Sequence, residues 1–133
     1  MLNSIKAISL GIVTLLLLEL LNQLVVIMAS VGFNYLIKSY PSLASWSQIF
    51  TYSIAALGHF IIMVITGMVV TMASISKQAF FNAGLAVIIG SAISLYFSLR
   101  DDIFTPIAFI FLISGLLFAF LGCWIWQRRE NRK

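Results

Sequence analysis

Charged residues are scarce in this chain: only 9% of its 133 residues are Asp, Glu, Lys or Arg, whereas 62% are hydrophobic. Soluble domains carry about a quarter of their residues as charges, so this composition excludes an ordinary soluble protein. No part of the sequence has the length and polarity of a separate soluble domain. We therefore expect residues 1–133 to form a single integral membrane domain.

Cysteine and histidine each occur once, as Cys123 and His59. A single cysteine excludes an internal disulfide and a multi-cysteine zinc site, and one histidine is too few for the usual histidine-based metal sites. The sequence also lacks the GxSxG, HExxH and glycine-rich phosphate-loop motifs of common enzyme families. We therefore expect no enzymatic activity, no metal and no cofactor.

Positive charge gathers at the C-terminus and does not indicate a nucleic-acid-binding surface. The net charge is +4, but four of the eight basic residues lie in the last six positions, at Arg128, Arg129, Arg132 and Lys133. A basic segment directly after an apolar one is typical of a cytoplasmic anchor that contacts anionic lipid headgroups. The expected partner is the lipid bilayer, with a homo-oligomer or another membrane protein as further candidates.

Long uncharged stretches separate the few charged clusters and have the length that a membrane span requires. A bilayer core about 30 Å thick is crossed by roughly 20 helical residues. Four segments meet this length, at about 5–29, 53–75, 79–98 and 103–126. The first exceeds the usual ~7 to 15 apolar residues of a signal peptide, so we interpret it as a retained helix. The sequence predicts an all-α, four-span transmembrane helical bundle.

The basic residues also predict the orientation of the spans, because Lys and Arg in short loops are biased towards the cytoplasm. In a four-span layout Lys6, Lys77 and the C-terminal basic residues fall on one side of the membrane. Lys38 and Arg100 fall on the other side. We therefore expect a multi-pass protein of the cell (inner) membrane with both termini in the cytoplasm.

The longest connection between spans is predicted from Gly32 to Tyr52. Within it, Pro41 suits the first turn of a helix, where its missing N–H is not needed. Apolar residues then recur at helical spacing among serines, at Leu43, Trp46, Ile49 and Phe50. We expect a short amphipathic helix on the outer interface, or an outward extension of the second span.

Small residues form stripes along the third and fourth spans. Spans associate in lipid through close packing of small side chains, because lipid leaves no hydrophobic drive between them. The stripe in the third span comprises Asn82, Ala86, Gly90, Ser94 and Ser98, and that in the fourth comprises Gly115, Ala119 and Cys123. The stripes either pack the helices of one chain together or form a homo-oligomer interface.

Glu19, Asn22 and Gln23 form the most polar cluster inside a span, and His59 lies at a similar depth in the second span. An ionised carboxylate near the centre of a membrane helix costs about 2.5 to 3.5 kcal/mol or more, so Glu19 should face the bundle interior. The cluster either joins the first and second spans by hydrogen bonds or forms a proton-coupled or ligand-binding site. Catalysis or metal binding is a third interpretation, which a single histidine disfavours.

The chain resembles two groups of small membrane proteins. From Gly58 to the C-terminus it is similar to small four-helix bacterial inner-membrane proteins of unknown function. These carry a histidine near the start of the second span followed by glycine and small residues, as in His59, Thr66 and Gly67 here. The single carboxylate midway along the first of four spans, Glu19, resembles that of the small multidrug resistance transporters. The first likeness implies a fold, and the second implies proton-linked transport.

Two functions follow as expectations. The leading one is a small non-enzymatic membrane protein, structural or accessory, that acts through helix–helix contacts. The alternative is a proton-linked transporter of small hydrophobic or cationic solutes that uses Glu19.

Overall fold

The chain folds almost entirely into helices. The structure is a computed structural model that describes residues 2–98 and 106–131. Its elements are α1 (Leu2–Ser39), η1 (Pro41–Trp46), α2 (Ser47–Ala73), η2 (Ser76–Gln78), α3 (Ala79–Ser98) and α4 (Pro106–Glu130), where η denotes a 3-10 helix. Four of these helices are long and apolar enough to cross a membrane. The prediction of an all-α fold with four helices of spanning length is confirmed for the described residues.

Helix α1 is longer than the predicted first span. Its 38 residues correspond to about 57 Å at 1.5 Å per residue, nearly twice the thickness of a bilayer core. Asn34 and Lys38 end the apolar stretch, but polar side chains do not interrupt the backbone hydrogen bonds of a helix. The helix ends at Ser39, and Tyr40 is not helical (φ −134°, ψ 80°) directly before Pro41. A residue that precedes proline is disfavoured in the helical conformation, which explains the break.

The connection between α1 and α2 is correspondingly short. Only Tyr40 and the six residues of η1 separate the two helices, because α2 begins at Ser47, ahead of the predicted start of the second span at 53. The structure therefore differs from the long connection predicted from Gly32 to Tyr52 and follows the alternative, an outward extension of the second span. An amphipathic helix resting on a membrane surface stays a prediction.

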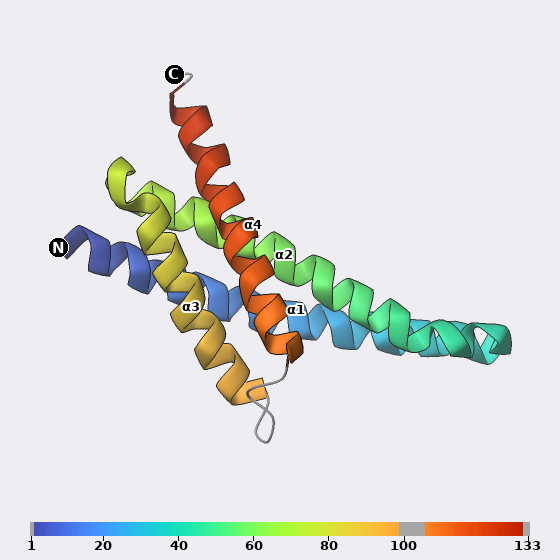
Figure 1. The fold of residues 1–133 in the computed structure, drawn as a ribbon. Helices are drawn as coiled ribbons and strands as arrows, with labels where there is room; N and C mark the ends of the chain where they lie inside the picture. Colours follow the sequence, from blue (N-terminus) through green and yellow to red (C-terminus); the bar gives the residue numbers. More distant parts are fainter. Residues whose placement is uncertain (1, 99–105, 132–133) are drawn as a thin grey trace.

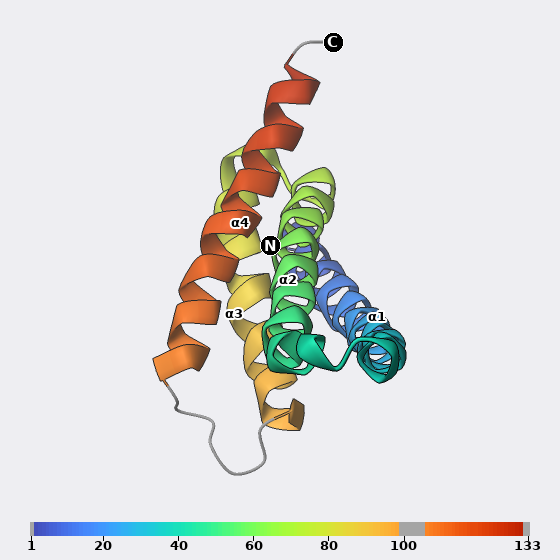
Figure 2. The ribbon, with the colours of Figure 1, turned by 90° about the vertical axis from the view of Figure 1, so that its right-hand side faces the viewer.

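Helices α1 and α2 run antiparallel, and α3 and α4 cross them over only part of their length (Figure 1). Helix α4 packs mainly on α2, and α3 packs mainly on α1. Figure 2 shows α3 and α4 as a second layer against the α1–α2 pair. The end of the α1–α2 pair that carries η1 extends beyond this layer as a two-helix hairpin (Figure 1). We define residues 24–57, none of which is buried, as the arm.

The residues that the structure describes as buried all lie where the four helices cross. Two apolar clusters form this core, one of Ala7, Val70, Ala83, Ala86 and Cys123, the other of Leu15, Ile62, Met63, Val87 and Ala119. Between Leu15 and Ile62 no residue is buried. The core therefore holds the crossed region together and leaves the arm outside it.

The arm is held by contacts between its own two helices. The rings of Phe33 and Phe50 stack with centroids 4.3 Å apart, and the hydroxyl oxygens of Ser30 and Thr51 lie 3.1 Å apart. Its outward apolar side chains are exposed, with Met28 at 75%. In water such a surface would be unfavourable, so this part of the chain suits an apolar surrounding.

Glycines let α2 and α4 approach backbone to backbone. A Cβ atom on Gly67 would overlap the backbone carbonyl of Ala119, and a Cβ on Gly122 would overlap that of Val64. The Gly67 carbonyl also accepts a hydrogen bond from Cys123 Sγ at 3.4 Å. Small residues at a helix crossing are the usual way in which membrane helices pack closely.

The start of α1 lies beside the turn between α2 and α3. Ser4 Oγ donates a hydrogen bond to Gln78 Oε1 at 2.7 Å, which places Lys6 and Lys77 at the same end of the molecule. Figure 1 shows the C-terminal end of α4 on the side of this turn. The expectation for Arg100 concerns a position outside the described residues, and the orientation in a membrane stays a prediction.

Candidate functional site

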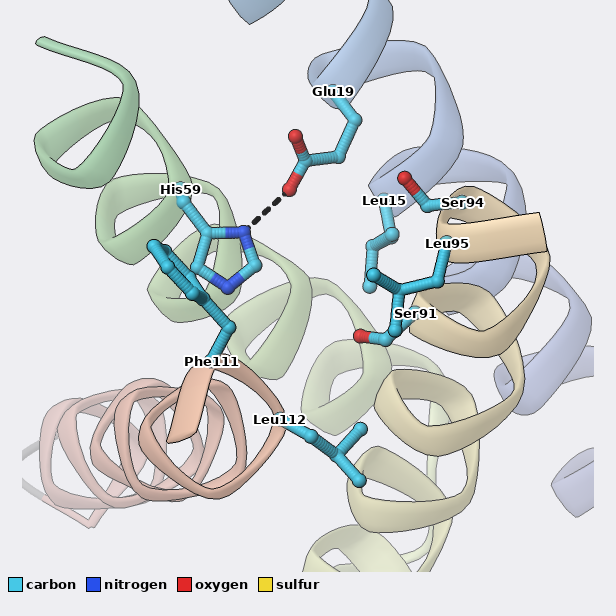
Figure 3. A pocket seen from close by; sticks show the side chains of 8 residues that line it. All are labelled: Leu15, Glu19, His59, Ser91, Ser94, Leu95, Phe111 and Leu112. Atoms are coloured by element: carbon cyan, nitrogen blue, oxygen red, sulfur yellow. Dashed lines mark hydrogen bonds and ion pairs between the residues drawn. The ribbon is translucent and has the colours of Figure 1, made fainter. Parts of the chain in front are cut away.

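Glu19 of α1 and His59 of α2 form a directly bonded pair. The Nδ1 atom of His59 lies 2.6 Å from Oε1 of Glu19 (Figure 3). The His59 and Glu19 side chains are only 16% and 15% exposed, respectively. The two residues grouped from the sequence by their depth are therefore in contact, and each screens the other from the surroundings.

The short distance requires a proton between the two atoms. Either Nδ1–H of His59 donates to the Glu19 carboxylate, or a protonated Glu19 carboxyl group donates to an unprotonated Nδ1. In both cases Nδ1 is occupied, so only the other ring nitrogen, Nε2, is available to a further partner. Nε2 is buried and has no hydrogen-bond partner among the residues that the structure describes. A group that bonds to Nε2 would therefore select the protonation state of the pair.

The pair borders a cavity of about 130 Å³ to which all four long helices contribute. Ser91 of α3 lies on another wall and is 7% exposed. Its hydroxyl has no hydrogen-bond partner in the described part of the chain, and Figure 3 shows it directed to the side on which the His59 ring lies. The cavity lining comprises Leu15, Glu19, His59, Ser91, Ser94, Leu95, Phe111 and Leu112. The space is mostly apolar and has two unpaired polar atoms on its walls.

The cavity is close in size to one that holds a small ring. An engineered apolar protein cavity of about 150 Å³ binds benzene. Phe111 contributes an aromatic wall, and its ring meets that of His59 edge to face with centroids 5.3 Å apart. The site therefore has room for a compact group of about six heavy atoms.

A second hollow, which we call the α1–α3 groove, adjoins the cavity. Its volume is about 500 Å³, and it is lined by Leu16, Glu19, Leu20, Gln23, Ile93, Ser94 and Phe97. Glu19 and Ser94 line both spaces. The groove lies at the molecular surface, since Leu20 is 59% and Phe97 is 80% exposed. Glu19 thus stands between an inner cavity and an outer, mainly apolar groove.

Asn22 and Gln23 are near the pair but do not bond to it. Asn22 Nδ2 donates to the backbone carbonyl of Ala55 at 3.3 Å and so joins α1 to α2. Gln23 is exposed and lines the α1–α3 groove. Of the four residues predicted to cluster, Glu19 and His59 form the pair, Asn22 supports the helix contact beside it, and Gln23 faces outwards.

The predicted stripe on α3 lies along α1. Ala86 is fully buried, and a Cβ placed on Gly11 of α1 would lie 2.8 Å from its methyl group. Gly90 is buried against Leu15, whose nearest side-chain atom would lie 3.1 Å from an added Cβ. Ser94, one turn further on, lines the cavity and the groove. The stripe therefore runs from a packed helix contact into the candidate site.

The predicted stripe on α4 lies along α2. Gly115 is close to His59, because a Cβ added there would lie 3.5 Å from Nε2 of His59. Ala119 is fully buried at the closest approach of α4 to Gly67, and Cys123 is buried one turn beyond. The imidazole ring thus lies near the backbone of α4, and a methyl group at position 115 would make only ordinary van der Waals contact with it.

Ser91 and Phe111 are site residues that the sequence did not indicate. Ser91 follows Gly90 directly and is outside the stripe that recurs every four residues, and Phe111 is one of eleven phenylalanines. Only the crossing of α3 and α4 over α2 places both side chains beside His59. The only sequence signal for Ser91 was that a serine is unusual in an apolar helix. This signal does not single out Ser91, because the third span contains several serines.

Within the part of the chain that the structure describes, no three His, Cys, Asp or Glu side chains lie together as a metal site requires. The site therefore offers proton-sharing and hydrogen-bonding groups beside an apolar space. Comparisons with protein-family models, with curated proteins and with solved structures found no match for this chain.

Proposed function

We propose that this protein binds a small solute in the cavity beside Glu19 and His59 and couples binding to a proton of that pair, as a proton-linked transporter does. One observation supports this proposal most strongly. His59 Nε2 and Ser91 Oγ are buried polar atoms without hydrogen-bond partners among the described residues, and both residues line the same cavity. Buried polar groups nearly always have a partner, because an unpaired one costs about 1 to 3 kcal/mol. A polar solute in the cavity would supply partners to both.

Proton coupling follows from the way the histidine is held. A solute that accepts a hydrogen bond needs a proton on Nε2, whereas one that donates needs a free lone pair there. Because Nδ1 is bonded to Glu19, either requirement decides how many protons the pair retains. Solute binding and proton binding are then linked by the same imidazole ring.

The proposal includes a placement in the membrane. The chain crosses the cell (inner) membrane four times with both termini in the cytoplasm, and η1 rests as an amphipathic segment on the outer surface. The contact between Ser4 and Gln78, which brings Lys6 and Lys77 to one end, supports this layout. The carboxylate of Glu19 in the first helix supports the transporter interpretation, through its likeness to the small multidrug resistance transporters.

A structural or accessory role is the second candidate, and the arm favours it. The arm presents apolar side chains from two helices that no other part of the described chain covers. Its exposed surface suits contact with lipid or with another membrane protein. In this role the Glu19–His59 pair would serve only to fix α1 against α2.

Proton release or uptake on solute binding separates the two candidates. The purified full chain, in weakly buffered detergent solution, is titrated with a series of small hydrophobic and cationic solutes while a pH indicator records bound protons. Binding is expected to change the proton count by about one per solute. Glu19→Gln should abolish this change and leave the melting temperature nearly unaltered, because glutamine keeps the shape and can still bond to Nδ1.

Glu130→Gln is the matched control, since Glu130 is an exposed carboxylate at the end of α4. This variant should bind solute and exchange protons like the unaltered protein. If no tested solute changes the proton count and Glu19→Gln is folded and stable, proton-linked transport is wrong and the accessory role remains.

A further inference from the structure

The cavity and the α1–α3 groove meet at Glu19 and Ser94. The cavity is small, at about 130 Å³, and carries the unpaired polar atoms, whereas the groove is larger, at about 500 Å³, and carries apolar side chains along its outer part. The two spaces therefore differ in chemistry in the way that the head and the tail of an amphiphile differ.

The outer part of the groove faces the region where lipid would lie. Leu16 and Leu20 of α1 and Ile93 and Phe97 of α3 form its apolar walls. A molecule lying between these side chains would keep contact with the bilayer along its length. The groove therefore gives lateral access to Glu19, in contrast to a path along the bundle axis.

The walls also indicate which headgroup fits. Among the described residues that line the two spaces there is no Lys or Arg, so a phosphate or carboxylate head would meet Glu19 without a counter-charge. A cationic head would have to compete with His59 for the carboxylate that lies 2.6 Å from its ring. An uncharged oxygen avoids both penalties, because it can bond to His59 Nε2 and Ser91 Oγ and leaves the pair intact.

We infer that the ligand of this site is an uncharged single-chain amphiphile. Its compact head carries hydroxyl or carbonyl oxygen and lies in the cavity against His59 and Ser91, while its apolar tail lies in the α1–α3 groove. Long-chain alcohols and long-chain ketones share this chemistry, and their heads fit the room for about six heavy atoms. This inference rests on the proposed solute-binding function and narrows its substrate class to lipid-dissolved molecules.

Photo-crosslinking in lipid nanodiscs tests the placement of the tail. The full chain is labelled with dodecanol that carries a diazirine near the end of its tail, and the modified residues are identified by mass spectrometry. Labels are expected on Leu20, Ile93 and Phe97. Excess untagged dodecanol or 2-dodecanone should suppress labelling, and the more effective of the two shows whether the head carries a hydroxyl or a carbonyl oxygen. Dodecane, which has no head, should not suppress it.

Two variants and a control locate the parts of the ligand. Ser91→Ala removes one hydrogen bond to the head and should weaken binding about 3- to 10-fold. Ile93→Trp fills the groove and should abolish labelling there. Ile110→Trp is the control, because Ile110 is 65% exposed on α4 and lines neither space.

Three outcomes would overturn the inference. Labels spread evenly over the exposed arm, with Ile93→Trp without effect, would show that the tail does not lie in the groove. Stronger displacement by dodecylammonium than by dodecanol would show a cationic head. A short water-soluble alcohol that binds as tightly as dodecanol and changes the proton count through Glu19 would show that the ligand needs no apolar tail. That result would contradict the amphiphile inference and would still agree with the proposed function. Binding in the groove without any proton change would instead support the amphiphile and contradict proton coupling.

Discussion

A carboxyl group and an imidazole 2.6 Å apart, with only one ring nitrogen left over, have few ways to share their protons. At the residue scale this restriction distinguishes the hydrogen bond between Glu19 and His59 from an ordinary interhelical hydrogen bond. Asn22 makes such an ordinary bond to the backbone of Ala55. That bond joins the two helices whether or not a cavity lies beside it. Ser91 is the second cavity-lining residue with a buried polar atom that lacks a partner among the described residues, and it is therefore as informative as the pair.

Removing one member of the pair should harm stability more than removing both. His59→Leu leaves the Glu19 carboxyl group without its partner and should lower the free energy of unfolding by about 1 to 3 kcal/mol. The double variant Glu19→Leu, His59→Leu replaces the pair with apolar side chains and should recover most of this loss. Thermal unfolding in detergent, followed by circular dichroism, measures both. A double variant less stable than His59→Leu alone would contradict this account of the pair.

At the scale of the elements, the contact between α2 and α4 depends on glycine more than any other contact between the long helices. At Gly67 and at Gly122 the space for a Cβ is occupied by backbone of the opposite helix. Backbone cannot move aside as a side chain can, so the whole helix would have to shift. Gly90 differs, because its neighbour is the flexible end of Leu15.

Gly67→Ala is expected to destabilise the protein by about 1 to 3 kcal/mol, as overpacking of a well-packed contact does. Gly84→Ala is the matched control at a buried helical position. Its Cβ would meet only the ring of Phe120, at an ordinary van der Waals distance of 3.6 Å. That control should be neutral or stabilising, because alanine favours the helix by about 1 kcal/mol over glycine. Equal melting temperatures for the two variants would show that α2 and α4 do not approach closely.

Gly90→Leu should separate α1 from α3 and lower the melting temperature, or break an oligomer if α3 forms its interface. The added isobutyl group has no room beside Leu15, whereas Gly90→Ala requires only a small movement of that side chain. Gly32→Leu is the control, because nothing lies within 4 Å of its added Cβ. An unchanged melting temperature and oligomer size for Gly90→Leu would place this face of α3 against lipid.

At the scale of the whole molecule, the crossed region and the arm have different environments. Among the residues whose burial the structure describes, all buried ones lie in the crossed region and none lies in the arm. Helix α1, at about 57 Å, is too long to stand upright within a bilayer core, so in the proposed placement it tilts or carries the arm tip beyond the membrane.

Cysteine labelling tests the orientation directly. In a Cys123→Ala background, single cysteines are placed at Ser45 in η1 and at Asn131 after α4, and intact cells are treated with a membrane-impermeant thiol reagent. The cysteine at 45 should react, and that at 131 should react only after lysis, because the basic residues beside it favour the cytoplasm. Reaction of the tail position before lysis would overturn the layout.

The sequence by itself determined that the chain is helical and has four helices of spanning length. Uncharged stretches of about 20 residues match spanning helices, whose backbone groups all bond within the segment, whereas a barrel strand needs only about 9 to 11 residues. It also grouped Glu19 with His59, because polar side chains at similar depth in adjacent spans tend to meet. Helix ends were less well determined, since Asn34 and Lys38 stop the apolar pattern without stopping α1.

Only the tertiary structure decided how the helices cross, and with that the shape of the site. Apolar spans present similar surfaces on every side, so their pattern does not say which face meets which neighbour. The crossing of α3 and α4 over one part of the α1–α2 pair created the cavity, brought Ser91 and Phe111 to its walls and left the arm uncovered. Gln23 moved out of the predicted cluster for the same reason: one position along a helix turns a side chain by about 100°, enough to change the space that it faces.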